Sequence, residues 1–335
     1  MIDDLVTQYV EAAKKRDALA AASDLFPNLH NAAYALSPRP PIESLVENML
    51  DRGTSNLIYG QWGSKKTWAI QYLFTRIAAN RPFLGMTVQG GPVLYFDEEN
   101  GDAEISDRFA KCIRGSNAKE DIPLWYNCLS GINLLKNPND ATKIITQAKA
   151  LDVVAIAFDT LAAVMAGGDE NSVRDTEPVL LALRKIAEES GAAILTIHHT
   201  GKNDDYRGSS AIAGAVNDMI RITSAKDSPF IIFKSEKKRR GKPFEFAARA
   251  TWTDDQFYLD EAELIHTHQL SKSRKFVIDR LEECGELSIR NIVDAAGDLY
   301  SRDAIKKAFQ FLVEENLIHR TDPGGAGVEA FYAKS

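Results

Sequence analysis

Short apolar runs alternate with longer amphipathic segments between residues 42 and about 260. Six runs predict strands, because they are short, rich in β-branched and aromatic residues and bounded by turn residues: SNLIYG, GPVLYFD, VVAIAFD, AAILTIHH, DMIRITS and FIIFKSE. The segments between them predict helices over residues 66–80, 102–113, 140–150 and 173–190. This alternation predicts an α/β fold with a doubly wound, mainly parallel sheet. Functional residues of such folds collect at the carboxyl ends of the strands.

The two ends of the chain have different patterns. Residues 3–23 predict a helix, and the prolines at positions 27, 38, 40 and 41 prevent a second long helix directly after it. We therefore expect an N-terminal helical arm over residues 1–41 and the α/β domain over residues 42–265. Residues 270–335 predict three short amphipathic helices and a glycine-tipped hairpin, which together are typical of a small winged helix-turn-helix domain.

Composition narrows the class of protein. The chain is 44% hydrophobic and 26% charged, as globular proteins are. No apolar run approaches the roughly 18 residues that cross a bilayer, and the first residues lack the apolar region of a signal peptide. Cys112, Cys128 and Cys284 give neither a disulfide framework nor a metal spacing. We expect a cytoplasmic protein without membrane contact.

The charge distribution restricts how the chain could bind nucleic acid. The formal net charge is −7, which excludes a globally basic nucleic-acid coat. The stretch KSEKKRRGK, residues 234–242, nevertheless carries six basic residues and one acid. Any contact with DNA must therefore come from local basic patches.

The stretch GQWGSKKTW, residues 60–68, follows a predicted strand and precedes a predicted helix. It matches the phosphate-loop pattern G-x-x-x-x-G-K-[ST], except that Lys65 stands where the last glycine belongs. In such loops backbone N–H groups surround the phosphates, a lysine reaches the phosphate oxygens and a hydroxyl holds Mg²⁺. The alternative is a strand-to-helix turn without a ligand. The predicted nucleotide-binding residues are Gly60, Gly63, Ser64, Lys65, Lys66, Thr67 and Trp68.

Carboxylates follow two of the predicted strands. Asp159 ends VVAIAFD, where a carboxylate can orient Mg²⁺ together with Thr67. Asp97, Glu98 and Glu99 follow GPVLYF, and one of them could act as the general base for an attacking water. The alternatives are an aspartate that caps the next turn and a solvated acidic turn.

Two histidines end a further strand. His198 and His199 point to opposite faces, and no carboxylate or cysteine lies at metal-ligand spacing. A hydrogen-bonding relay between nucleotide and the next loop is one interpretation, and a satisfied strand-end histidine is the other. The loop after these histidines is polar and carries Lys202 and Arg207.

The sequence over residues 42–250 resembles RecA-fold ATPases of the RepA-like and DnaB-like replicative helicase group, which are plasmid- or prophage-type AAA ATPases. Three stretches carry the resemblance most specifically: GPVLYFDEENG, FDTLAAVMAGGDENSVRD and HHTGKNDDYRGSSAIAGAVND. The resemblance implies ATP and Mg²⁺. It also implies that Lys66 is the phosphate-loop lysine and that Thr67 and Asp159 form the metal site.

The resemblance implies further roles for single residues. Glu99 matches the glutamate that activates water, and His199 looks like the sensor position. Lys237 and Arg239 match the lysine and the arginine finger that such ATPases supply to the ATP of a neighbouring subunit, with a register uncertain by one. The loop that contains Lys202, Arg207, Ser209 and Ser210 corresponds to loops that bind single-stranded DNA.

The resulting hypothesis is a ring-forming, hexameric replicative helicase that acts on single-stranded DNA, with a replication initiator or a primase as a further partner. One rival is a DNA-dependent ATPase without unwinding activity, such as a loader, a recombination or repair mediator or a regulator. Arg302, Lys306 and Lys307 of helix 301–315 would then contact DNA, unless the C-terminal domain docks on protein. A second rival, favoured only by Lys65, is a binding protein with a degenerate phosphate loop.

Overall fold

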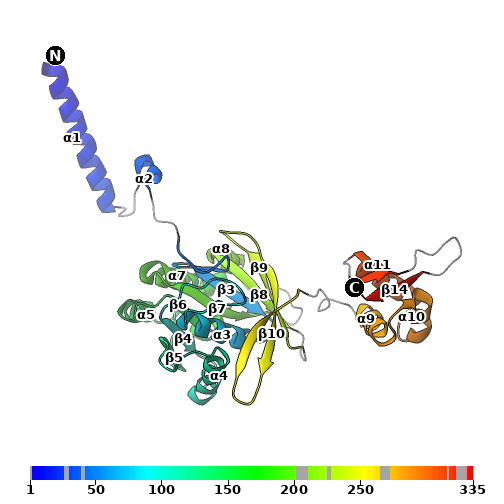
Figure 1. Ribbon diagram of the computed structural model, residues 1–335. Helices are drawn as coiled ribbons and strands as arrows, with labels where there is room; N and C mark the ends of the chain where they lie inside the picture. Colours follow the sequence, from blue (N-terminus) through cyan, green and yellow to red (C-terminus); the bar gives the residue numbers. More distant parts are fainter. Residues whose placement is uncertain are drawn as a thin grey trace. The chain divides into compact units, whose positions relative to one another are not determined.

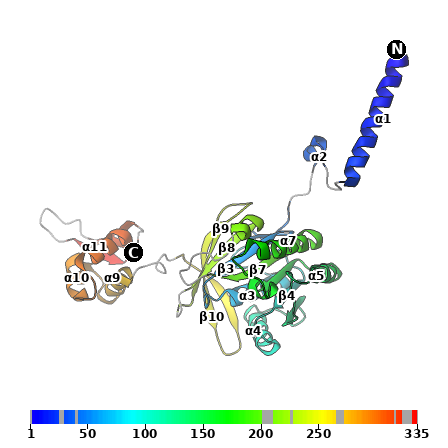
Figure 2. The same cartoon turned by 180° about the vertical axis from the view of Figure 1, so that it is seen from behind.

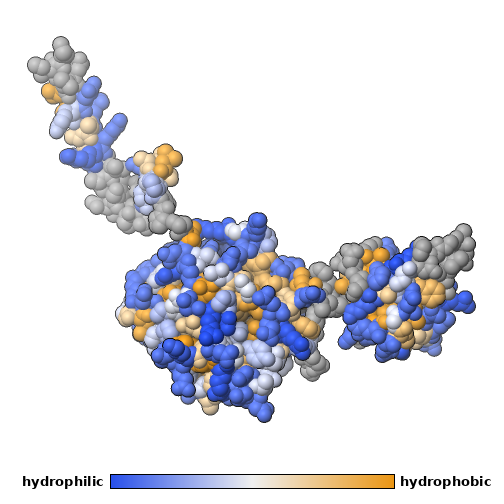
Figure 3. Space-filling view, viewed as in Figure 1, coloured by the Kyte–Doolittle hydropathy of each residue, from blue (hydrophilic) through white to orange (hydrophobic). Residues whose placement is uncertain are grey.

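The computed structural model describes residues 2–25, 30–38, 42–200, 210–224, 228–264, 272–314, 317–321 and 330–334. The chain divides into two units, Met1–Ile42 and Glu43–Ser335 (Figure 1). The first unit contains α1 (Ile2–Leu25) and the short α2 (Ala32–Leu36). The side chain of Asn31 caps α2 by accepting a hydrogen bond from the Tyr34 N–H at 2.9 Å. Tyr34 and Leu36 are exposed, and some of the residues at α2 are orange in Figure 3.

A nine-stranded sheet organises the second unit, counted over the part of the chain that the structure describes. Its order is β11-β10-β9-β8-β3-β7-β6-β4-β5. Six strands run parallel: β3 (Ser55–Gly60), β4 (Val93–Asp97), β5 (Leu124–Cys128), β6 (Ala155–Asp159), β7 (Ala193–His199) and β8 (Asp218–Thr223). Three antiparallel strands extend it: β9 (Phe230–Lys237), β10 (Glu245–Trp252) and β11 (Phe257–Ala262). The predicted α/β fold with a mainly parallel sheet is confirmed.

Helices cover both faces of this sheet (Figures 1 and 2). Successive residues of β3 show the division, because Leu57 is buried in one hydrophobic core and Ile58 in the other. The core with Ile58 contains α3 (Lys66–Ala78) and α4 (Asp102–Gly115). The core with Leu57 contains α5 (Asn139–Ala150), α6 (Leu161–Val164), α7 (Val173–Ser190) and α8 (Ser210–Ala215). The four helices predicted between the strands are α3, α4, α5 and α7.

A small hairpin lies outside the main sheet. It consists of β1 (Ser44–Val46) and β2 (Leu50–Asp51), which pair antiparallel. Leu45, Val46, Met49 and Leu50 of the hairpin are buried in the core that also contains α3. These two strands were not predicted from the sequence.

The C-terminal residues form three helices and a three-stranded antiparallel sheet, in the ranges described. The elements are α9 (Lys272–Cys284), β12 (Leu287–Ser288), α10 (Ile289–Ala296), α11 (Arg302–Glu314), β13 (Ile318–Arg320) and β14 (Phe331–Lys334), with the strand order β12-β14-β13. This region has its own core, which includes Val277, Leu281, Ile292, Ile305 and Phe309. None of the helices in the described ranges is long and apolar enough to cross a bilayer.

Candidate active site

The phosphate loop starts where β3 ends, in the middle of the sheet between β7 and β8. Gly60 closes the strand at a point where a Cβ atom would lie 2.1 Å from the Ile222 carbonyl oxygen of β8. Gly63 turns the loop with φ +80°, and nothing lies within 4 Å of where its Cβ would be. The first glycine is therefore required by packing and the second by backbone conformation.

Lys65 adopts the left-handed backbone conformation, with φ +64° and ψ +22°. This is the region that glycine adopts most easily, which explains why the phosphate-loop pattern has glycine there. The Lys65 side chain turns towards β8, and its Nζ donates a hydrogen bond to Ser224 Oγ at 2.7 Å. Lys65 thus keeps the loop conformation and adds a tie to the end of β8.

Lys66 is a buried cation at the start of α3, with 3% of its surface exposed. Its Nζ donates to the carbonyl oxygens of Gly60 and Gln61, each at 2.8 Å, and approaches Ser64 Oγ at 3.4 Å. Burial lowers the pKa of Lys66 to about 8, although the negative charges of Asp159 and Glu99 raise it. Lys65, at the N-cap position of α3, makes no side-chain capping hydrogen bond. A helix N-terminus beside a buried lysine is suited to bind an anion.

Asp159 joins the phosphate loop to the end of β6. Its Oδ2 accepts hydrogen bonds from Thr67 Oγ1 and from the Tyr95 hydroxyl, both at 2.8 Å. Burial and the nearby charge of Asp97 together raise the pKa of Asp159 to about 6, although these two hydrogen bonds lower it. A buried carboxylate that is costly to ionise and that touches a hydroxyl is suited to hold a divalent cation.

The three consecutive acids after β4 face three different environments. The Asp97 carboxylate is buried and accepts the backbone N–H groups of Glu99 and Asn100 at 3.0 and 2.7 Å, so it fixes the turn. Glu98 accepts the N–H groups of Ser130 and Gly131 in the loop after β5 at 3.2 and 2.9 Å. The Glu99 side chain instead contacts side chains at the ends of β6 and β7.

Glu99 contacts residues from both of those strands. Its Oε1 accepts a hydrogen bond from Thr160 Oγ1 at 2.8 Å, and His199 Nε2 lies 3.7 Å from the same oxygen. The pKa of Glu99 is lowered by His199 and by Thr160, while partial burial opposes them. The carboxylate is therefore ionised at neutral pH and can accept a proton. His198 lies on the other face of β7, with Nδ1 3.8 Å from Glu170 Oε2.

These residues fit a nucleotide with Mg²⁺. Lys66 and the first turn of α3 would hold the phosphates, and Thr67 with Asp159 would hold the metal. Two acids raise the pKa of Asp159, so a cation between Thr67 and Asp159 would relieve that repulsion. The candidate residues from β3, β4, β6 and β7 thus meet at one edge of the sheet, as expected for carboxyl ends of parallel strands.

Trp68 packs away from this edge, into an aromatic cluster. Its ring centroid lies 4.7 Å from that of Phe257 and 6.3 Å from that of Trp252, and the Arg108 guanidinium lies 5.5 Å from its ring. Trp62, which was not among the predicted site residues, is 87% exposed on the phosphate loop itself.

Lys237 and Arg239 lie at the opposite edge of the sheet from the phosphate loop. β9 runs antiparallel to β8, and Lys237 pairs with Met219 near the start of β8. Lys237 Nζ donates to the carbonyl oxygens of Ala213 and Val216, the latter at 2.7 Å. Arg239 is exposed and donates to the Gly214 carbonyl at 2.7 Å.

The predicted DNA-contacting residues fall into two groups. Lys202, Arg207 and Ser209 lie outside the described residues, and Ser210 begins α8. Arg302, Lys306 and Lys307 are exposed on α11 of the C-terminal region. Exposure allows a contact but identifies no partner.

Three residues of the site were not predicted from sequence: Tyr95, Thr160 and Ser224. Tyr95 shares a face of β4 with Asp97, and Thr160 directly follows Asp159, so strand alternation and adjacency could have indicated both. Ser224 had no comparable signal, because its contact with Lys65 depends on the pairing of β3 with β8.

Comparison with known proteins agrees with this geometry. A family model described as an AAA domain, AAA_25, matches residues 23–205, more than half of the chain. A comparison with curated proteins finds no match. The mostly parallel central sheet, with a phosphate loop after β3, fits a RecA-like P-loop domain. The chain therefore belongs to the AAA_25 family and is a P-loop, RecA-like ATPase.

Proposed function

We propose that this ATPase is a ring-forming motor on single-stranded DNA, of the replicative helicase type that plasmids, phages and prophages carry. The observation that carries the proposal is the position of Arg239. The phosphate loop lies at the carboxyl ends of the parallel strands, whereas the Arg239 turn lies at their amino ends. A chain therefore cannot bring its own Arg239 to its own phosphate loop, and a site that uses both combines residues of two neighbouring subunits.

The distance between Arg239 and the phosphate loop can be counted in residues along β3 and β8. The Arg239 N–H donates to Asp218, and Asp218 pairs with Asn56, which lies four residues before Gly60. At about 3.3 Å per residue this is about 13 Å along the strand, and the phosphates would lie beyond Gly60. Arg239 therefore serves the ATP of the next subunit. A finger supplied in trans accelerates phosphoryl transfer by ~10³–10⁵ in other NTPases.

The side chains at the carboxyl ends of the parallel strands have different roles in hydrolysis. Lys66 would bind the phosphate oxygens, and Thr67 and Asp159 would hold Mg²⁺, which would supply positive charge to neutralise those oxygens. Glu99 accepts the proton of the attacking water, held in place by Thr160. His199 contacts Glu99 and so senses the state of the site from the end of β7.

The same edge connects the nucleotide to the DNA-binding loop. The Thr200 N–H donates to the Gly60 carbonyl at 3.1 Å, so the end of β7 is bonded to the start of the phosphate loop. Lys202, Arg207, Ser209 and Ser210 follow Thr200 within ten residues. We propose that they bind the phosphate backbone of single-stranded DNA, in a way that is sequence-tolerant and sensitive to salt.

Steady-state ATP hydrolysis with and without single-stranded DNA tests the proposal, with Lys66→Ala as the control. We expect strong stimulation by DNA that Lys66→Ala abolishes and that weakens as salt rises. Strand separation of a forked duplex is the next assay. Hydrolysis that is indifferent to DNA would overturn the motor function while leaving the ATPase in place.

The C-terminal region supports a second candidate, a DNA-dependent ATPase without unwinding activity. It contains three helices and a three-stranded sheet, the set of elements expected for a winged helix, and α11 exposes Arg302, Lys306 and Lys307. Such a helix could enter a DNA major groove. This candidate predicts duplex binding that is lost when the three basic residues are changed to alanine, together with no strand separation of the fork.

A further inference from the structure

The turn that carries Arg239 is anchored by a buried ion pair on its first residue. Lys238 Nζ lies 2.6 Å from Asp218 Oδ2, and their side chains are only 4% and 7% exposed. Lys238 also approaches the Met49 carbonyl of the β1–β2 hairpin at 3.4 Å. Lys238 is therefore directed into the molecule, although it belongs to a stretch of exposed basic residues.

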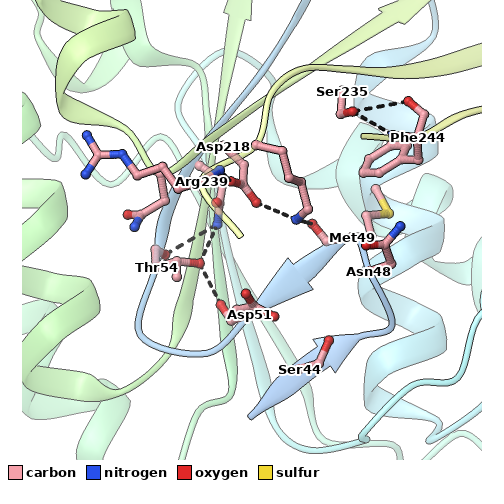
Figure 4. A network of polar contacts seen from close by, with 12 residues as sticks. Ser44, Asn48, Met49, Asp51, Thr54, Asp218, Ser235, Arg239 and Phe244 are labelled. Carbon is pink, nitrogen blue, oxygen red and sulfur yellow. Dashed lines mark hydrogen bonds and ion pairs between the residues drawn. The ribbon is translucent and has the colours of Figure 1, made fainter. Parts of the chain in front are cut away.

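The same carboxylate also holds the next residue. Asp218 Oδ1 accepts the backbone N–H of Arg239 at 2.9 Å, so the two oxygens of one side chain bind two successive residues. Figure 4 shows Asp218 and Arg239 side by side, next to Thr54 and Met49. With its backbone fixed there, Arg239 exposes its guanidinium beside the Gly214 carbonyl.

The β1–β2 hairpin holds the far end of the turn. Asn48 Oδ1 accepts the Lys242 N–H at 3.1 Å. Gly241 has φ +78°, and a Cβ there would lie 2.7 Å from Asn48 Oδ1. The turn thus fits closely against the hairpin, and its residues before and after Arg240 are both bonded to the body of the domain.

Stability alone does not account for this arrangement. Apolar residues of similar volume usually replace a buried ion pair at little loss of stability, whereas a catalytic group needs its position held within a fraction of an ångström. We propose that Asp218 is a positioning residue for Arg239, fixing its backbone so that the guanidinium meets the ATP of the neighbouring subunit. This inference rests on the proposed function, in which Arg239 acts in trans.

Asp218→Asn tests the inference, because it keeps the size and one acceptor oxygen but releases Lys238. We expect kcat to fall about 10–100-fold in the presence of single-stranded DNA, since small misplacements of catalytic groups have effects of this size. KM for ATP should stay within about twofold, because the phosphate loop is unaffected. Asp254→Asn, which changes an exposed carboxylate in the β10–β11 turn, is the matched control and should keep its activity.

Mixing subunits separates positioning from a general structural role. A Lys66→Ala subunit cannot use its own loop but keeps an intact Arg239. Combined with Asp218→Asn subunits, it should restore hydrolysis at their intact loops, just as it should for Arg239→Ala subunits. If mixing restores Arg239→Ala but not Asp218→Asn, the positioning role is overturned.

The remaining outcomes distinguish a failure of this inference from a failure of the proposed function on which it rests. Normal turnover by Asp218→Asn with loss in Arg239→Ala would overturn the role of Asp218 only. Normal turnover by Arg239→Ala would overturn the shared site itself. Should Asp218→Asn unfold, the pair Asp218→Asn/Lys238→Met leaves no unpaired buried charge, and the same kcat loss and rescue are expected from it.

Discussion

The backbone and the side chain of Lys65 have opposing effects on the stability of the folded chain. Its left-handed conformation is unfavourable for a side chain by roughly 1–2 kcal/mol. Its hydrogen bond to Ser224 contributes about 1 kcal/mol in return. The phosphate loop can therefore carry a lysine in the glycine position without losing its shape.

Two substitutions separate these effects. Lys65→Gly and Lys65→Ala both remove the bond to Ser224, but only glycine relieves the backbone. We expect Lys65→Gly to be more stable than Lys65→Ala by about 1 kcal/mol, measured from urea unfolding at equal ionic strength. Equal stability of the two variants would show that the loop changes its conformation when the lysine is absent.

Asp159, the proposed metal ligand, lowers the stability of the folded chain when it is ionised. The pKa of about 6 means that the folded chain binds the proton more tightly than the unfolded chain, whose value is near 3.8. Stability therefore falls as pH rises from about 3.8 to about 6, and the full penalty is present above that range.

Asp159→Asn should relieve this penalty, because the amide oxygen can still accept the bonds from Thr67 and Tyr95. Without nucleotide at pH 7.5, we expect the free energy of unfolding to rise by about 1–3 kcal/mol, at about 1.4 kcal/mol per pKa unit. Mg²⁺-dependent hydrolysis should be lost. At pH 4.5 the gain should shrink, and a gain that is the same at both pH values would contradict the assignment.

Substitutions of Glu99 and of the adjacent Glu98 test which of the two activates the attacking water. Glu99 faces Thr160 and His199, whereas Glu98 binds the loop after β5. Glu99→Gln should lower turnover by about 10²–10⁴-fold with ATP affinity nearly unchanged, the usual range for loss of a general base. Glu98→Gln should stay within a few-fold of the parent. Single-turnover hydrolysis and nucleotide titration measure both, and a reversed order would transfer the role to Glu98.

At the scale of elements, β3 determines where the loop can begin. It is the strand that β7 and β8 flank, and its last residue touches the backbone of β8. Gly60→Ala should therefore lower the free energy of unfolding by about 3 kcal/mol or more, as overpacking against a rigid backbone does. Gly63→Ala should lower the free energy of unfolding by only about 1 kcal/mol, because only the positive φ disfavours alanine at that position. Denaturant unfolding compares them, and similar losses would mean that β8 yields to the added methyl group.

Burial explains which elements the sequence predicts. β3, β4, β6 and β7 are buried along nearly their whole length, and a strand covered on both faces is mostly apolar, so each is recognisable in the sequence. β8 and β9 were predicted from shorter apolar stretches, because polar and charged residues interrupt or follow them. β5, β10 and β11 were not predicted. β5 is an edge strand in which exposed and half-buried residues alternate, and β10 and β11 extend the other edge with charged and small residues among the apolar ones. The β1–β2 hairpin is too short to carry a pattern of its own.

The candidate site also contains residues that the sequence predicts and contacts that it does not. Lys66, Thr67, Glu99, Asp159 and His199 were predicted because each occupies a recognisable place at the end of a strand. The contacts of Lys65 with Ser224 and of Asp218 with Lys238 were not, because they join segments more than 15 residues apart whose register only the folded sheet defines. A local pattern reports which residues end a strand, but not which strands become neighbours.

At the scale of the whole molecule, the two edges of the sheet give each chain one surface that offers a nucleotide site and another that offers an arginine. Under the proposed function these surfaces meet head to tail, which is the kind of contact that closes into rings. The contact is unlike a two-fold dimer, because the two sides of it are different.

Under the proposed function, the separation of Arg239 from its own phosphate loop, about 13 Å or more at about 3.3 Å per strand residue, would also set the kinetic order of the reaction. Hydrolysis would be an encounter between copies, so turnover per chain should rise in proportion to protein concentration and level off once assembly is complete. ATPase assays over a dilution series, with light scattering alongside, measure this, and Arg239→Ala should give a low, flat line. Constant turnover per chain down to concentrations where only monomers scatter would contradict it. If hydrolysis does require assembly, the abundance of the protein would control its activity, because an isolated chain could hold ATP for a long time without hydrolysing it.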